Sequence, residues 1–145
     1  MPIPISFTEK DLKRGATVEP SFYLARIDDV GQAPAKDGGS MNYPVDLTIL
    51  KDATNGSEKF NDVPVTFQFN SKAMGFAIGF MKVLNPELEL KADQKYDLES
   101  AKGQMIEVFI GNKEYNGRIL NDVKTDTFRA AGTGDKVKAA QPVGV

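Results

Sequence analysis

The sequence predicts a mainly β fold, in which five strands form a barrel and one helix lies between the third and fourth strands. Three observations support this prediction. Apolar and polar residues alternate along several short stretches, as they do in strands with one buried face. One stretch, residues 71–84, is apolar on nearly all sides, as in a buried helix. Clusters of Gly, Pro, Asn and Asp separate these stretches and predict turns.

The first three strands are predicted in the first half of the chain. They cover residues 21–30, 42–49 and 63–70, with a Gly- and Pro-rich loop at 31–40 and a turn at 52–62. Alternate residues of each strand should face the core. These residues are Tyr23, Ala25 and Ile27 in the first strand, Tyr43, Val45, Leu47 and Ile49 in the second, and Val63, Val65, Phe67 and Phe69 in the third.

Two helices are predicted. The apolar helix at residues 71–84 can be capped by Asn70 or Ser71, and it ends before Pro86, which cannot continue a helix. A shorter helix begins after Thr8, whose hydroxyl can accept a hydrogen bond from a backbone N–H of the first turn. The apolar helix should pack against the sheet and close one side of the barrel.

The last two strands are predicted as a hairpin. They cover residues 104–110 and 118–123, with an extension of the second to Phe128 left open, and Asn116-Gly117 between them is a strong hairpin-turn dipeptide. Residues 1–129 should therefore form one barrel domain with a short N-terminal helix or arm, followed by a flexible tail at 130–145. The expected core contains Tyr43, Val45, Leu47, Ile49, Val65, Phe67, Phe69, Phe76, Phe80, Ile106 and Val108.

The composition excludes several kinds of chemistry. The 145 residues include no Cys and no His, which removes disulfides, thiolate zinc sites and Ser-His-Asp or Cys-His catalysis. We therefore expect no enzyme activity, no metal and no cofactor. No apolar run approaches the roughly 20 residues of a membrane span, and the N-terminal sequence is not that of a signal peptide, so a cytoplasmic protein is expected. The net charge of −2 argues against strongly electrostatic binding of duplex DNA.

The predicted order of three strands, one helix and two strands is that of an OB-fold, whose second and third strands and flanking loops bind oligonucleotides. From Phe22 to Thr127 the sequence also resembles a family of small phage replication and recombination proteins with OB-like folds, some of which bind single-stranded DNA. The resemblance lies in residues 23–27, 38–39, 43–49, 98–103 and 114–121 and in the apolar helix. It implies a protein that coats single-stranded DNA stoichiometrically, in the cytoplasm of a host cell if the protein is viral.

Binding a single strand without sequence preference needs cations for the phosphates and aromatic rings on which bases stack. Lys113, Tyr115 and Arg118 offer both around the predicted hairpin turn, where Tyr115 and Arg118 should be cross-strand partners. The plainer interpretation is that the phenylalanines pack internally and the lysines are solvated. The candidate residues for contacting nucleic acid are Arg26, Lys36, Lys51, Lys59, Phe60, Phe109, Lys113, Tyr115 and Arg118.

Two other functions stay open at this point. The chain could be a structural or assembly protein of a virus particle, whose terminal arms become ordered against neighbouring copies. Glu89-Leu90-Lys91, with Asp46 on another strand, is also similar to part of a metal-nuclease site, although Glu-x-Lys is common by chance. The sequence determines neither the length of DNA covered, nor a preference for DNA over RNA, nor whether the chain forms a homo-oligomer.

Overall fold

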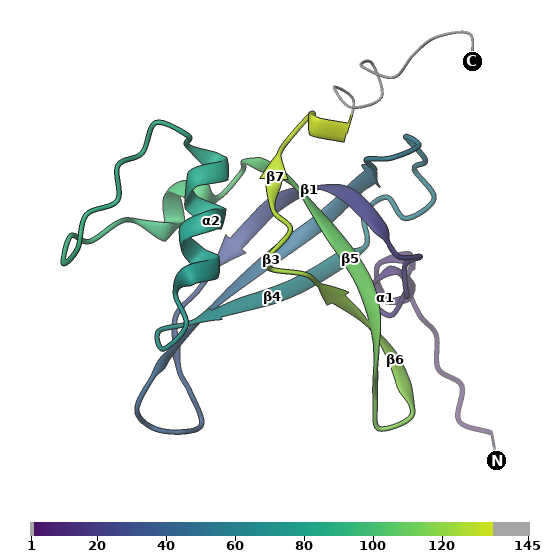
Figure 1. Ribbon diagram of the computed structural model, residues 1–145. Helices are drawn as coiled ribbons and strands as arrows, with labels where there is room; N and C mark the ends of the chain where they lie inside the picture. Colours follow the sequence, from purple (N-terminus) through teal and green to yellow (C-terminus); the bar gives the residue numbers. More distant parts are fainter. Residues whose placement is uncertain (1, 135–145) are drawn as a thin grey trace, which may run out of the picture.

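A computed structural model describes residues 2–134, except for the side chains of Lys10 and Arg14, and these residues form one antiparallel sheet with a helix on one side (Figure 1). The elements in chain order are α1 (Glu9–Arg14), β1 (Ser21–Val30), β2 (Ala33–Pro34), β3 (Met41–Asp52), β4 (Pro64–Asn70), α2 (Gly75–Leu84), the 3-10 helix η1 (Leu98–Ala101), β5 (Met105–Tyr115), β6 (Arg118–Val123) and β7 (Arg129–Ala130). No helix within the described residues is long and apolar enough to cross a membrane.

The long strand β1 lies at the centre of the sheet. It pairs with β3 on one side and β5 on the other, β4 extends the sheet beyond β3, and β6 extends it beyond β5. The two-residue strands β2 and β7 pair with β3 and β5. The long strands therefore follow the order β4-β3-β1-β5-β6, in which the first strand of the chain is the middle strand of the sheet.

The predicted closure of the sheet into a barrel is not observed. The outer strands β4 and β6 form no ladder with each other in residues 2–134, so the sheet is open. The chain between α1 and β1 lies against β6 instead. Its Val18 N–H donates to Asn121 Oδ1 at 2.9 Å, and Asn121 Nδ2 donates to the Ala16 carbonyl at 2.9 Å. This incoming segment lines one groove together with β4 and β6, and these two outer strands come close to each other without forming a ladder.

The alternation of the first three long strands is confirmed. Every inward residue predicted for the strands at 21–30 and 63–70 is buried, and so are three of the four in the strand at 42–49. Two residues of the predicted core differ from the expectation, since Tyr43 is half-buried and Phe76 is 47% exposed. The other predicted core residues are all buried.

The predicted burial of the apolar helix on all sides is wrong. Helix α2 begins at Gly75 instead of residue 71, and Met74 at its N-cap makes no side-chain capping bond. Only Ala77 and Phe80 of the helix are buried. The Phe80 ring packs 5.7 Å from that of Phe67 and 5.1 Å from that of Phe128. One face of α2 therefore contacts the sheet, with Met81, Val83 and Leu84 partly buried against the core. The exposed apolar side chains of the helix and its N-cap are Met74, Phe76 and Ile78.

The chain after β6 returns to the sheet. Strand β7 pairs with β5 at the point where a tail was expected to begin, and Gly134 N–H donates to Glu107 at 3.0 Å. The Arg129 guanidinium also meets Glu107, with Nε 2.8 Å from the carboxylate. This segment covers the outer side of β5, which explains why Glu107 is buried between two buried apolar neighbours. The rest of the predicted tail, residues 135–145, lies outside the described residues.

Candidate nucleic-acid interface

The β5–β6 hairpin projects beyond the sheet (Figure 1). Its turn is formed by Asn116 and Gly117, which have φ values of 50° and 77°. Two successive residues with positive φ define the turn type whose twist matches that of the flanking strands, and Asn-Gly is its preferred sequence. Tyr115 and Arg118 are cross-strand partners across this turn, as predicted.

Three of the candidate residues share one face of this hairpin. Lys113 is two residues before Tyr115 on β5, so their side chains point to the same side, and Arg118 lies opposite Tyr115. Tyr115 is 65% exposed, and both cations are exposed. Neither cation has an ion-pair partner within the part of the chain that the structure describes. The face therefore presents an uncovered aromatic ring and two available positive charges. We call Lys113, Tyr115 and Arg118 the hairpin face.

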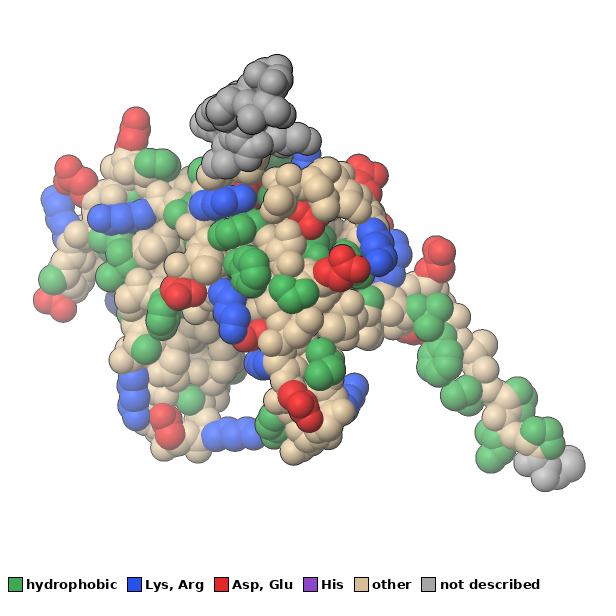
Figure 2. Space-filling view, turned by 45° about the vertical axis from the view of Figure 1, so that its right-hand side comes forward, with side chains coloured by type: hydrophobic (Ala, Val, Ile, Leu, Met, Phe, Trp, Pro, Cys, Tyr) green, Lys and Arg blue, Asp and Glu red, His purple; other side chains and the backbone are tan. Residues whose placement is uncertain are grey.

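A shallow groove of about 340 Å³ lies beside the hairpin face. Lys113 and Arg118 line it together with Thr17 from the segment before β1 and Thr66 from β4. Figure 2 shows a hollow at the lower edge of the molecule, with Lys and Arg side chains on both sides of it. The two threonine hydroxyls already donate to protein acceptors, Thr17 to the Ile119 carbonyl and Thr66 to the Asp46 carboxylate. The groove's available ligands for phosphate oxygens are therefore its two cations.

Strand β4 extends from the groove beside the hairpin to a second projecting loop. Its outward residues Pro64, Thr66 and Gln68 are exposed, and none of them is charged. The strand runs between the hairpin and the β2–β3 loop, and both project on the same side of the sheet in Figure 1. In an OB-fold, the second and third strands and these two loops form the oligonucleotide site. In this chain the second and third long strands are β3 and β4.

The β2–β3 loop is ordered around one carboxylate. Asp37 accepts hydrogen bonds from Gly39 N–H at 2.9 Å and Ser40 N–H at 3.0 Å, and it forms an ion pair with Lys72 at 3.1 Å. The Gly39 N–H is the main reason that the pKa of Asp37 is lowered, with Ser40 and Lys72 adding to the effect. Lys36 is exposed beside it. The loop therefore adds a candidate cation at the far end of β4 from the hairpin.

Two candidate cations lie elsewhere and already have carboxylate partners. The Arg26 guanidinium donates to Asp28 at 2.7 Å, and this bond and the charge of Asp28 raise the pKa of Arg26. Lys59 is 3.1 Å from Glu19. A third, Lys51, is half-buried on β3. Lys51 and Lys59 are near the end of β3 opposite to the β2–β3 loop, roughly 36 Å away along a strand of 12 residues.

The other two candidate aromatic residues are used in packing. The Phe60 ring lies edge-on to Tyr23 at 6.2 Å, and the Phe109 ring lies edge-on to Phe22 at 5.4 Å. Both phenylalanines are half-buried, whereas Tyr115 is exposed. The structure thus brings Lys113, Tyr115 and Arg118 together and separates the remaining candidate residues from them.

The outward residues of β4 were not singled out from the sequence, and one of them, Thr66, lines the groove with Lys113 and Arg118. The alternation of β4 predicts its outward positions. Only the curvature of the sheet, which brings the outer strands β4 and β6 close together, places Thr66 beside the hairpin. The nuclease-like residues do not form a cluster of acidic ligands, since none is found in residues 2–134. Lys91 N–H and the Glu89 carbonyl both bond to the Tyr96 hydroxyl instead.

Comparison with known proteins adds no family assignment. A scan against protein-family models found no matching family, and a search of curated proteins found no significant match. The geometry of the site and the strand order therefore support the functional argument on their own.

Proposed function

We propose that this chain is an OB-like single-stranded-DNA-binding protein that acts stoichiometrically in DNA replication or recombination of the phage type. The strand order supports an OB-like fold, because β1 pairs with both β3 and β5 and a helix follows the third long strand, β4. Partly open barrels are common among OB-folds. The central observation is the hairpin face, an exposed ring beside two available cations at one end of β4. The outward residues of β4 are uncharged, and the one carboxylate bonded to them within residues 2–134 is that of the exposed Asp46.

In this proposal, one base stacks on the Tyr115 ring while Lys113 and Arg118 contact the adjacent phosphates. The DNA strand then follows β4, where Gln68 can bond to sugar and phosphate groups, toward Lys36 in the β2–β3 loop. Such contacts are tolerant of sequence because every base has a π-face and every nucleotide a phosphate. With no His and no Cys, the chain has neither the usual general base nor a thiol nucleophile, which favours binding without turnover in the cytoplasm.

The alternative is a structural or assembly protein of a virus particle. Exposed apolar side chains in the N-terminal segment and on α2 favour this alternative, because such surfaces commonly mark contacts between proteins. An assembly protein of this kind would not need the cations and the aromatic ring of the hairpin face. The two functions therefore differ in whether a bare oligonucleotide binds.

A fluorescent oligothymidine titration tests the proposal. We expect anisotropy to rise with protein concentration at low salt, to fall as salt is added, and to exceed the response of a duplex of equal length. Tyr115→Ala should weaken binding by about 1–3 kcal/mol, whereas Tyr115→Phe retains a stacking face and should bind like the parent. Absence of binding would favour the assembly protein, and cleavage in the presence of magnesium would instead indicate a nuclease.

A further inference from the structure

The N-terminal segment presents an uncovered apolar surface. We call residues 2–8 the N-terminal arm; these residues are all exposed and none is charged. Ile3 is 87% exposed, Ile5 is 75% exposed and Phe7 is 65% exposed. Pro2 and Pro4 restrict the backbone of the arm, so little conformational freedom is lost when it binds in an extended form.

A second uncovered apolar surface is a groove on the other side of the molecule. Helix α2 forms one wall of this groove, residues 90–99 form the other, and the groove has a volume of about 1070 Å³. The hydroxyl of Tyr96 holds the second wall in place, since it bonds to the backbone of Glu89 and Lys91. The floor and helix wall of this α2 groove are apolar and include Phe69, Met74, Ile78 and Met81, while the second wall also carries charged side chains, namely Lys91, Asp93, Lys95, Asp97 and Glu99.

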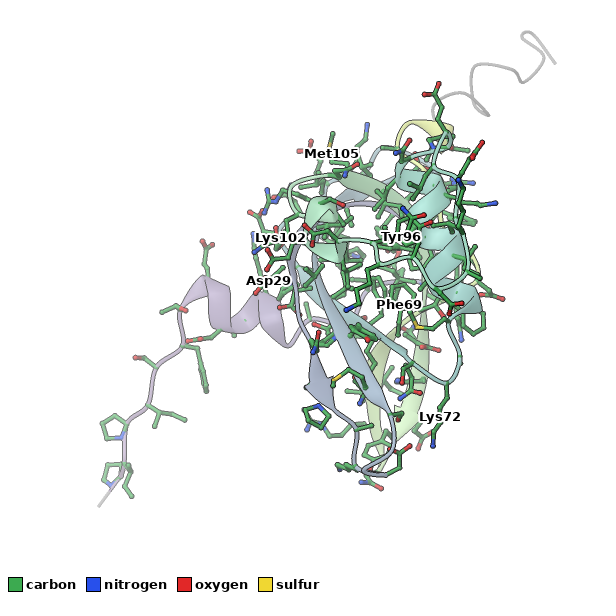
Figure 3. The ribbon with its side chains drawn as sticks, turned by 90° about the vertical axis from the view of Figure 1, so that its left-hand side faces the viewer. Asp29, Phe69, Lys72, Tyr96, Lys102 and Met105 are labelled. Carbon is green, nitrogen blue, oxygen red and sulfur yellow. The ribbon has the colours of Figure 1, made fainter. Side chains whose placement is uncertain are left out.

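The arm does not reach the groove of its own chain. In Figure 1 the arm and α1 lie at the right of the molecule, where α1 contacts β4, and α2 lies at the left. Figure 3 views the groove side, where Tyr96 and Phe69 lie near α2 while the arm projects away from the body. The arm is long enough to lie along the helix wall of the groove. Seven extended residues span about 23 Å, and the ten residues of α2 rise about 15 Å.

We infer that the N-terminal arm of one copy binds in the α2 groove of a second copy. The uncharged arm supplies Ile3, Ile5 and Phe7, and the groove supplies the apolar floor and helix wall that they need. Because the arm and the groove are different surfaces of one chain, two copies can exchange arms and close as a dimer, or the contact repeats from copy to copy into a larger ring or an open chain. This self-association goes beyond the proposed function, since it requires no DNA.

Sedimentation of the full chain over a range of concentrations tests the inference without DNA. The parent should shift from monomer to larger species as concentration rises. The arm variant Ile3→Ser/Ile5→Ser and the groove variant Ile78→Ser should stay monomeric at concentrations where the parent associates. Phe76→Ser is the matched control, because Phe76 is on the same helix with 47% exposure against 48% for Ile78 but does not line the groove. It should associate like the parent.

A mixing experiment separates this contact from a symmetric one. The arm variant retains an intact groove, and the groove variant retains an intact arm, so their mixture can form one productive contact. The mixture should therefore form a one-to-one dimer and nothing larger. A monomeric parent, a mixture that stays monomeric, or equal losses in Ile78→Ser and Phe76→Ser would each overturn the inference. Circular dichroism melts confirm folding, and since the affected side chains are exposed, we expect unchanged midpoints.

Discussion

Glu107 is a buried carboxylate in the middle of β5, with only 2% of its surface exposed. Its partners come from the end of the described chain, where Arg129 Nε is 2.8 Å away and Gly134 N–H is 3.0 Å away. Arg129 also stacks on the Phe22 ring, 3.8 Å from its centroid. These contacts attach residues 129–134 to the outer side of the sheet.

Removing the guanidinium from this buried pair should destabilise the fold strongly. Arg129→Ala leaves the Glu107 carboxylate buried with one backbone donor, and breaking a buried pair costs about 3–5 kcal/mol. Lys102→Ala is the control, because both partners of its ion pair with Asp29 are exposed and such pairs contribute about 0–1 kcal/mol. Urea unfolding measures both. Equal midpoint shifts for the two variants would show that the Glu107 pair is not structural.

The raised pKa of Tyr23 leads us to predict how the stability of the protein responds to alkaline pH. Burial, with smaller contributions from Asp52 and Glu19, raises the pKa of Tyr23 from 10.0 to about 12. Below pH 10 the phenol is protonated in both the folded and unfolded states, so its contribution is constant. Between pH 10 and 12 the unfolded chain loses this proton first, and stability should therefore fall as pH rises.

The comparison with Tyr23→Phe isolates this effect. The variant loses the hydroxyl that donates to the Glu19 carbonyl at 2.5 Å, so it should be less stable near neutral pH. Its urea midpoint should then decline less than that of the parent from pH 10 to 12. Parallel pH profiles would mean that Tyr23 does not account for the alkaline loss.

The sequence could not reveal the role of Glu107 because its neutralising partners are distant along the chain. A glutamate among the apolar residues at 105–110 does indicate a buried carboxylate that needs a partner, since buried charges are paired. The partner, however, depends on the return of residues 129–134 to β5. Local pattern predicted where Tyr115 lies with respect to Arg118, because a two-residue turn sets the register of a hairpin.

At the scale of elements, the hairpin depends on Gly117. Its φ of 77° is strained for any side chain, although a Cβ there would meet no other atom. Gly117→Ala should therefore destabilise the protein by about 1 kcal/mol through the backbone alone. Asn116→Gly, which keeps the positive φ accessible, is the control. Thermal unfolding should separate the two variants, and Gly117→Ala should also weaken oligothymidine binding.

The orientation of helix α2 implies that replacing its two phenylalanines changes the stability of the protein to very different extents. Phe80 is fully buried among aromatic rings, so Phe80→Ala should cost about 3–5 kcal/mol. Phe76 is 47% exposed, and Phe76→Ala should cost less than about 1 kcal/mol. Urea denaturation gives both values. A large loss for Phe76→Ala would contradict the observed orientation of the helix.

Strands were predicted more accurately than the apolar helix. A strand exposes its inward and outward residues alternately, so β1, β3 and β4 could be oriented from sequence alone. Residues 71–84 are apolar on most sides, and such a pattern does not indicate which face meets the sheet. The extension of β5 to Tyr115 was also missed, because residues 111–114 lack apolar alternation and are held by pairing with β6.

At the scale of the whole molecule, the element order predicted a closed barrel, but closure depends on contacts that no local pattern contains. The segment that includes Ala16 and Val18 bonds to Asn121 of β6. The groove lined by Lys113 and Arg118 lies at the opening of the sheet, between β6 and β4. The proposed DNA path therefore begins where the barrel is open.

The proposed DNA path implies that particular cations determine the dependence of binding on salt. Each phosphate contact on a single strand contributes about 0.7 to the slope of log affinity against log salt concentration. Arg118 is exposed and has no ion-pair partner in residues 2–134, whereas Arg26 is engaged by Asp28. The two arginines thus form a matched pair, both exposed on strands, of which only Arg118 is expected to contact DNA.

The most direct test is the salt dependence of oligothymidine binding for the parent, Arg118→Ala and Arg26→Ala. We predict that Arg118→Ala binds more weakly with a slope about 0.7 shallower, while Arg26→Ala keeps the parental slope. If the slope of Arg118→Ala equals that of the folded parent, or if both variants change the slope equally, the hairpin face is not the DNA-binding site.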